Sequence, residues 1–139
     1  MKSTRNFGLG ALSYKYGVDG FLYYALNSWG NNALPADTSR IPFVGWNPNG
    51  ISMPETYNGE AILFAAGKDG HIPTIRMEMM RDGLEDYEYY TLAGKKTGLT
   101  RGTPGAVPKK IADHPRVHTT DPDALEAERE RLAQEILKP

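Results

Sequence analysis

Five carboxylates and two arginines lie within residues 76–90, RMEMMRDGLEDYEYY, and this density raises the question of acid–base chemistry. Two carboxyl groups can cleave a glycosidic bond when they lie about 5–5.5 Å or about 6.5–9.5 Å apart. Asp82 and Asp86 are four residues apart, so on a helix they could meet the shorter separation. Catalytic groups of α/β barrels, however, lie at the C-terminal ends of strands rather than in mid-helix. We therefore interpret these acids as architectural.

An acidic row follows from the same spacing. Glu78, Asp82 and Asp86 recur at every fourth residue of the predicted helix 74–93. Like charges at this spacing destabilise an exposed helix by about 0.2–0.5 kcal/mol per pair. The row is therefore predicted to have cationic or backbone-donor partners elsewhere in the fold. The candidate partners are Arg5, Lys15, Arg40 and the basic segment 95–120.

The predicted helix also carries an apolar stripe with spacings of three and four residues, which indicates the face that packs on the core. Gly83 lies inside the helix, where glycine costs about 1 kcal/mol relative to alanine. We predict that another backbone or a large side chain approaches closely there. Gly94 is the predicted stop of the helix. The stripe consists of Met77, Met80, Leu84, Tyr87 and Thr91.

A group of residue types suited to sugar binding follows the apolar run Phe21–Leu26. Trp29 could stack on a sugar ring, while Tyr24 and Asn27 could hydrogen-bond to hydroxyl groups. Aromatic core packing, with Asn27 as a turn residue, explains the same residues equally well. Arg76 lies in the first turn of the helix that follows a strand and loop, on the side where barrel sites form.

Metal and cofactor chemistry find little support in the sequence. The chain has no cysteine, and no glycine-rich phosphate loop is present. His71 follows Asp69 in a turn without further ligands, and Pro115 separates His114 from His118, so we expect neither a metal site nor a cofactor. The net charge of −1 and the lack of an apolar run of about 20 residues predict neither nucleic-acid nor membrane binding.

The elements that must position these residues alternate between helix and strand, which is typical of an α/β protein with parallel strands. Both strands are short continuous apolar runs, of the kind that is buried on two faces. Two such strands cannot form an independent sheet, so the pattern indicates part of a larger barrel or doubly wound sheet. The predicted order is helix 4–16 ending at Gly17, strand Phe21–Leu26, loop 28–60, strand Ala61–Ala66, helix 74–93, linker 95–120 and helix 121–137.

Two long motifs carry a family resemblance. YGVDGFLYYALNSW and IPTIRMEMMRDGLEDYEYYTL resemble the C-terminal part of the catalytic domain in the domain-of-unknown-function 4091 family, which includes or lies close to glycoside hydrolase family 123, the β-N-acetylgalactosaminidases. The resemblance covers roughly residues 5–93, and the ending EAERERLAQEI also fits that family.

The resemblance implies a partial (β/α)8 TIM barrel plus a C-terminal helix. Phe21–Leu26 and Ala61–Ala66 would be the last two barrel strands, and helix 74–93 the last barrel helix. The implied division places the barrel portion in residues 1–94, a linker or irregular segment in 95–120 and the C-terminal helix in 121–139.

The resemblance also implies a substrate-assisted mechanism that needs an adjacent Asp-Glu pair. In that mechanism the Glu is the general acid/base and the Asp orients the substrate's acetamido group, which acts as nucleophile. The chain contains no Asp-Glu dipeptide, its Glu85-Asp86 is reversed, and Tyr24 stands where the family usually has Trp. We therefore expect a fragment that binds or hydrolyses N-acetylhexosamine glycans but is inactive alone, with an upstream barrel-completing chain or a second copy as partner. The alternative is a carbohydrate-binding or structural interaction module in which Trp29 and Trp46 form the surface.

Overall fold

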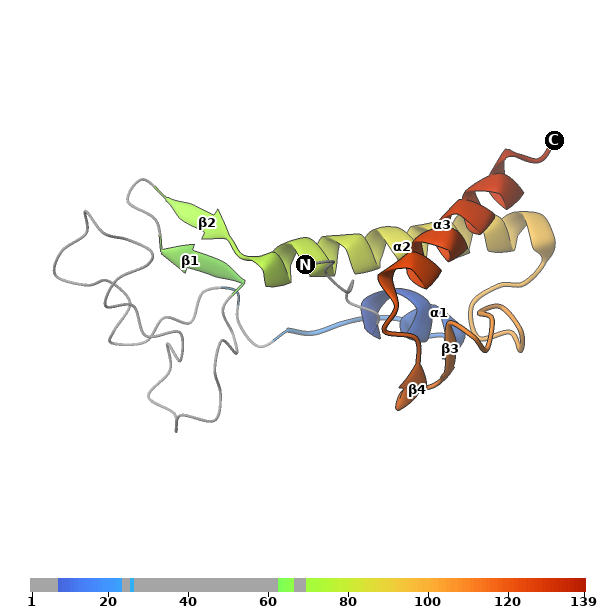
Figure 1. Cartoon of the computed structure of the whole chain (residues 1–139), viewed down its shortest axis with the longest axis horizontal. Helices are drawn as coiled ribbons and strands as arrows, with labels where there is room; N and C mark the ends of the chain where they lie inside the picture. Colours follow the sequence, from blue (N-terminus) through green and yellow to red (C-terminus); the bar gives the residue numbers. More distant parts are fainter. Residues whose placement is uncertain (1–7, 24–25, 27–62, 67–69) are drawn as a thin grey trace, which may run out of the picture. The chain divides into compact units, whose positions relative to one another are not determined.

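A computed structural model describes residues 8–23, 26, 63–66 and 70–139. The chain divides into two compact units, one formed by Met1–Phe21 with Met79–Pro139 and the other by Leu22–Glu78. The long helix α2, Ile75–Thr97, begins in the second unit and continues in the first (Figure 1).

Helix α2 begins where the sequence predicts and ends later. The carbonyl of Thr74 accepts from the amides of Met77 and Glu78 at 2.9 and 3.3 Å, which places the helix start directly after Thr74. The predicted stop at Gly94 is wrong, because the helix continues to Thr97. Its end is at Gly98, which has a φ of +77° and donates its amide to the Gly94 carbonyl at 2.9 Å.

The N-terminal helix is confirmed within the described residues. It consists of a π-helical turn η1, Gly8–Leu12, followed by helix α1, Ser13–Lys15. Gly17 has a φ of +65° and, as predicted, terminates the helix, with the Val18 amide donating to the Ser13 carbonyl at 2.9 Å. Tyr16 is half exposed whereas Tyr14 is buried, since the wider π turn rotates the positions that follow it.

Aromatic packing joins this N-terminal helix to α2 in the first unit. The ring of Tyr14 stacks on Tyr90 with centroids 5.3 Å apart and meets Tyr87 edge-on at 5.5 Å. Gly10 lies against Gly83, and a Cβ atom built on Gly10 would be 2.9 Å from the Gly83 carbonyl oxygen. The predicted close approach at Gly83 is therefore confirmed.

The predicted apolar stripe of α2 is only partly confirmed, because Tyr87 packs against the core but Leu84 does not. The buried residues of α2 are Gly83, Tyr90, Ala93 and Gly94, whereas Leu84 is 53% exposed. Apolar and aromatic residues occur all around this helix, so helical spacing alone did not distinguish the face that packs. The small residues are buried because they allow the N-terminal helix to approach.

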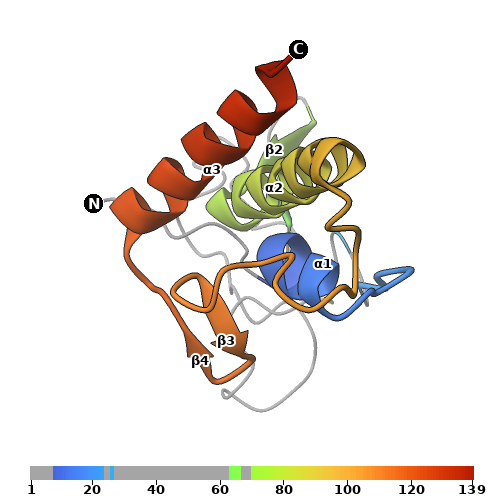
Figure 2. The ribbon, with the colours of Figure 1, turned by 90° about the vertical axis from the view of Figure 1, so that its right-hand side faces the viewer.

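Helix α3, Pro122–Leu137, packs on α2 from another side (Figures 1 and 2). Asp121, which precedes a first-turn proline in the sequence, is its N-cap, with its side chain accepting from the Asp123 amide at 3.0 Å. Leu125 and Leu132, seven residues apart, are buried, and Ile136 packs against the same core.

Residues 95–120, expected as a linker or irregular segment, contain the end of α2 and a small antiparallel pair, β3 (Ala112–His114) and β4 (Val117–His118). This stretch also contributes to the core of the first unit. Its buried residues are Ala106, Val107, Ile111 and Ala112.

The second unit contains β1, Phe64–Ala66, and β2, His71–Pro73. A strand within 61–66 was predicted, but its pairing is a correction: β1 pairs antiparallel with β2, with Ala65 opposite Ile72. The short connection between the two strands makes a local hairpin possible, whereas parallel pairing needs a long crossover.

The first predicted strand, Phe21–Leu26, is not present in its described residues. Residues 21–23 form no strand, and Leu22 is 92% exposed rather than buried. The mixed helix-and-sheet class is thus confirmed. Within the described residues, however, the strands form two separate two-stranded antiparallel sheets and no part of a parallel barrel.

Candidate functional site

Three of the four predicted sugar-site residues, Tyr24, Asn27 and Trp29, lie outside the described residues. The fourth, Arg76, is exposed in the first turn of α2 and belongs to the second unit. The structure therefore does not bring these four side chains together, and their role in binding a sugar stays a prediction.

One member of the acidic row of α2, Asp86, has a cationic partner elsewhere in the fold, as the spacing predicts, whereas the Asp82 carboxylate pairs with Arg81 of the same helix at 3.3 Å. Asp86 accepts from Arg129 on α3, at 2.8 Å from Nε and 2.7 Å from the second guanidinium nitrogen, both to Oδ1. The side chains of Arg129 and Asp86 are only 17% and 16% exposed. An ion pair so well shielded from water joins the two helices more strongly than an exposed pair would.

Arg129 makes three further contacts with α2. Its guanidinium donates to the Asp82 carbonyl at 3.1 Å, pairs with Glu85 at 3.4 Å and lies 5.3 Å from the ring centre of Tyr89. Burial alone would lower the pKa of Arg129, but the hydrogen bond to Asp86 and the surrounding carboxylates raise it, so the guanidinium stays charged.

Sequence reasoning missed Arg129, since the candidate partners were sought in the N-terminal half and the basic segment. A signal was present. Arg129 is four residues after Leu125 and three before Leu132, so it lies on the stripe of α3 that faces the core.

A second charged group, Glu128, is almost fully buried on the same helix. Arg131 donates to its two carboxylate oxygens at 2.9 and 2.7 Å, and the Tyr90 hydroxyl lies 3.3 Å from Oε1. Burial, reinforced by the Glu128 charge, raises the pKa of Tyr90, which keeps its hydroxyl protonated as a donor. A buried carboxylate satisfied in this way is an architectural group.

The arrangement of these acids does not favour catalysis. Asp86, Glu128, Tyr90 and Arg129 line one internal cavity of about 10 Å³, which is room for a single water molecule and far too little for a sugar ring. Each of the two carboxylates also has an arginine bound to it. The interpretation of these acids as architectural is therefore supported by their geometry.

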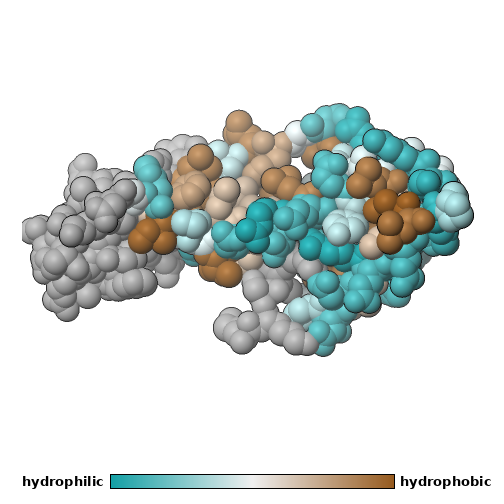
Figure 3. All heavy atoms as spheres, turned by 90° about the horizontal axis from the view of Figure 1, so that it is seen from above, coloured by the Kyte–Doolittle hydropathy of each residue, from teal (hydrophilic) through white to brown (hydrophobic). Residues whose placement is uncertain are grey.

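An open apolar groove of about 260 Å³ lies elsewhere on the first unit. Leu9, Val18, Phe21, Leu84 and Tyr87 supply most of its lining. Figure 3 shows such hydrophobic side chains interrupting the hydrophilic surface of the described residues. Two exposed acids, Asp19 and Glu88, are among its described lining residues, and Asp19 forms an ion pair with Arg101 at 2.6 Å.

Neither a metal site nor a membrane helix is found in the part of the chain that the structure describes. No group of three or more histidine, aspartate or glutamate side chains there could hold a metal ion. None of its helices combines the length and apolar character needed to cross a bilayer.

The described elements define a protein of the mixed helix-and-sheet class, in which shielded charge pairs join two helices. Residues 1–93 match the family model described as "Glycoside hydrolase 123, catalytic domain". The chain therefore belongs to the glycoside hydrolase 123 catalytic-domain family, as its two motifs indicate. A search of curated proteins and a search of solved structures give no match to the chain.

Proposed function

We propose that this chain is the C-terminal portion of a glycoside hydrolase 123-type (β/α)8 barrel that acts on N-acetylhexosamine glycans. Residues 1–94 would be the barrel portion, 95–120 an irregular connection and 121–139 the closing helix. The observation that carries the proposal is the family match over residues 1–93. The high exposure of Leu22 supports it, because an exposed apolar side chain of this kind is typical of a surface that another part of a barrel would cover.

The proposed sugar-facing residues are Tyr24, Asn27, Trp29 and Arg76. In a barrel, residues at the C-terminal ends of strands and at the start of the next helix meet on one face, where substrates bind. Trp29 would stack on the sugar ring, and the other three would hydrogen-bond to hydroxyl or acetamido groups. Binding of a glycan fits the family, whose members act on carbohydrates.

The proposal assigns no catalytic acid to this chain. Its sequence has no Asp-Glu pair, and the two shielded carboxylates, Asp86 and Glu128, are bound to Arg129 and Arg131. The acids would have to come from outside these 139 residues, so residues 1–139 are expected to bind sugar weakly and to hydrolyse nothing alone.

The test combines turnover with binding on the purified chain. We expect no release of p-nitrophenol from p-nitrophenyl N-acetyl-β-galactosaminide above the rate without protein. Turnover that disappears when any one acid of the chain is replaced would overturn the inactivity. For binding, quenching of tryptophan fluorescence by N-acetylgalactosamine should weaken severalfold in Arg76→Ala and remain unchanged in the matched variant Arg81→Ala; equal quenching in both would remove Arg76 from the site.

The second candidate is a structural interaction module that completes another chain. The exposed apolar side chains Phe21, Leu22 and Leu84 favour it, since surfaces of this kind mark contacts with partners. Such a module needs no sugar site of its own. Absence of any sugar binding, together with co-purification with a chain that carries an Asp-Glu pair, would favour this candidate over the first.

A further inference from the structure

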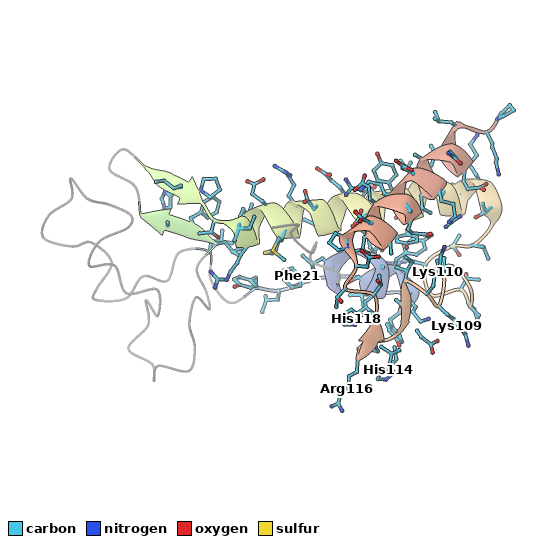
Figure 4. All side chains as sticks on the ribbon, viewed as in Figure 1. Phe21, Lys109, Lys110, His114, Arg116 and His118 are labelled. Atoms are coloured by element: carbon cyan, nitrogen blue, oxygen red, sulfur yellow. The ribbon has the colours of Figure 1, made fainter. Side chains whose placement is uncertain are left out.

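Five basic side chains surround the hairpin of β3 and β4, and together we name them the hairpin patch. They are Lys109, Lys110, His114, Arg116 and His118, all exposed. Figure 4 shows His114 and Arg116 at the end of this hairpin, with Arg116 projecting outward, and Lys109 on the loop that precedes it. The patch lies beyond residues 1–93, the part of the chain that matches the family.

The hairpin that carries these side chains is anchored to the core of the first unit. Ile111 and Ala112, which lead into it, are fully buried in the core of the first unit. The Thr119 amide donates to the Ile111 carbonyl at 3.0 Å, and the Lys15 ammonium donates to the Ala112 carbonyl at 2.9 Å. Anchoring at both ends limits the motion of the exposed residues between them, so the charged groups are presented at low conformational cost.

The tip is also folded upon itself. The Arg116 amide donates to Nδ1 of His114 at 3.2 Å, and Nδ1 of His118 lies 3.0 Å from the Pro115 carbonyl oxygen. These contacts use the backbone of Arg116 and leave its guanidinium directed to solvent.

The patch differs from the rest of the first unit in its charge balance. On the helices, Arg129, Arg131 and Lys138 each have a carboxylate oxygen at 2.7 Å. In the patch the single acid is Asp113, which lies 3.9 Å from Lys109. Lys110 and Arg116 form no ion pair with any residue that the structure describes. Lys110 and Arg116 therefore lack a counter-charge among the described residues, and an anionic ligand would supply one.

We propose that the hairpin patch binds an acidic polysaccharide through its sulfate or carboxylate groups. A guanidinium matches the planar geometry of such oxyanions, and lysines add charge along an extended chain. Residues 109–120 contain no Phe, Tyr or Trp on which nucleic-acid bases could stack, and the net charge of −1 gives no general attraction to nucleic acid. Membership of a glycoside hydrolase family favours a glycan as the polyanion, and the inference does not depend on how the barrel is completed.

The experiment measures binding of the full chain to fluorescent hexasaccharides by anisotropy at low salt. The probes are a heparin hexasaccharide, a hexamer of galacturonate and the neutral chitohexaose. The double variant Lys110→Ala/Arg116→Ala should bind both acidic probes about tenfold more weakly, because it loses two charge contacts. The matched control Lys95→Ala/Lys96→Ala removes the same charge from exposed positions of α2 and should change the affinity less than about twofold.

One further variant gives a result that unfolding cannot produce. Asp113→Asn removes the only acid of the patch and should tighten binding to the acidic probes by about two- to threefold. Binding of chitohexaose should be the same in every variant, so failure of the patch is distinguishable from failure of the proposed sugar site. The proposal would be overturned if both double variants weakened binding equally or if Asp113→Asn gave no gain in affinity. It would also be overturned if the chain bound an oligonucleotide or phosphatidylserine vesicles more tightly than the acidic hexasaccharides.

Discussion

Replacing Arg129 by alanine tests whether the acidic row of α2 is held by α3. Asp86 would lose one hydrogen bond from Nε and an ion-pair contact of 2.7 Å with the second nitrogen, and the Asp82 carbonyl would lose a further hydrogen bond. A hydrogen bond to a charged group is worth about 1.5–3 kcal/mol. Breaking a fully buried pair costs about 3–5 kcal/mol. Both side chains retain about one-sixth of their exposure, so water replaces part of the loss. We expect the free energy of unfolding to fall by about 2–4 kcal/mol.

The measurement is urea denaturation followed by far-ultraviolet circular dichroism at neutral pH. Arg81→Ala is the matched control, because Arg81 pairs with carboxylates on the same helix but is 59% exposed, and it should cost less than about 0.5 kcal/mol. A double-mutant cycle with Asp86→Ala isolates the interaction, for which we expect a coupling energy of about 1.5–3 kcal/mol. If the single effects add to within about 0.5 kcal/mol, Arg129 and Asp86 do not act together and the reasoning is refuted.

Three other changes test the architecture. Gly94→Ala should lower the free energy of unfolding by about 1–3 kcal/mol despite the better helix propensity of alanine, because a Cβ there would collide with the Tyr14 hydroxyl. The control Gly20→Ala, with open space around it, should leave the free energy of unfolding unchanged in the same urea assay. Asp121→Ala should cost about 1 kcal/mol through loss of the α3 cap; an unchanged urea midpoint would show that the cap contributes nothing. The pKa of Tyr90 is raised above its usual 10.0 by folding, so the protonated Tyr90 hydroxyl contributes fully to the free energy of unfolding below about pH 10. Above that pH the free energy of unfolding should fall by about 1.4 kcal/mol per pH unit. Tyr90→Phe should flatten this decline in thermal denaturation between pH 9 and 11, and an equally steep decline would contradict the assignment.

Local signals in the sequence predicted the ends of elements well. Asp121 followed by a proline specifies a cap, and Gly17 specifies a left-handed residue, because each depends on the conformation of only a few neighbouring residues. Gly94 carries the same kind of signal, but the helix end predicted there is wrong, because Gly94 is needed for contact with Tyr14 and not for ending the helix. A glycine can serve either purpose, and only the packing partner distinguishes them.

Pairing across the chain was harder to predict. The acidic row indicated that a cation was needed, but it did not indicate which of the many basic residues would supply it. The apolar run ending at Ala66 indicated a strand, but its partner β2 is a short, exposed segment without strand periodicity. Tertiary contacts of this kind depend on the arrangement of whole elements, which residue spacing along one element does not encode. The sugar-site prediction falls on residues that the structure does not describe, apart from Arg76.

The motif that identifies the family acts, in this structure, through packing. Gly83 admits Gly10, Asp86 binds Arg129 on α3, and Tyr90 is buried between helices. None of these packing contacts requires a catalytic acid in the same chain. Family membership here is therefore evidence about architecture first, and activity has to be argued from the residues at a site. For that reason the decisive observations are the turnover and binding assays, and not the density of carboxylates in residues 76–90.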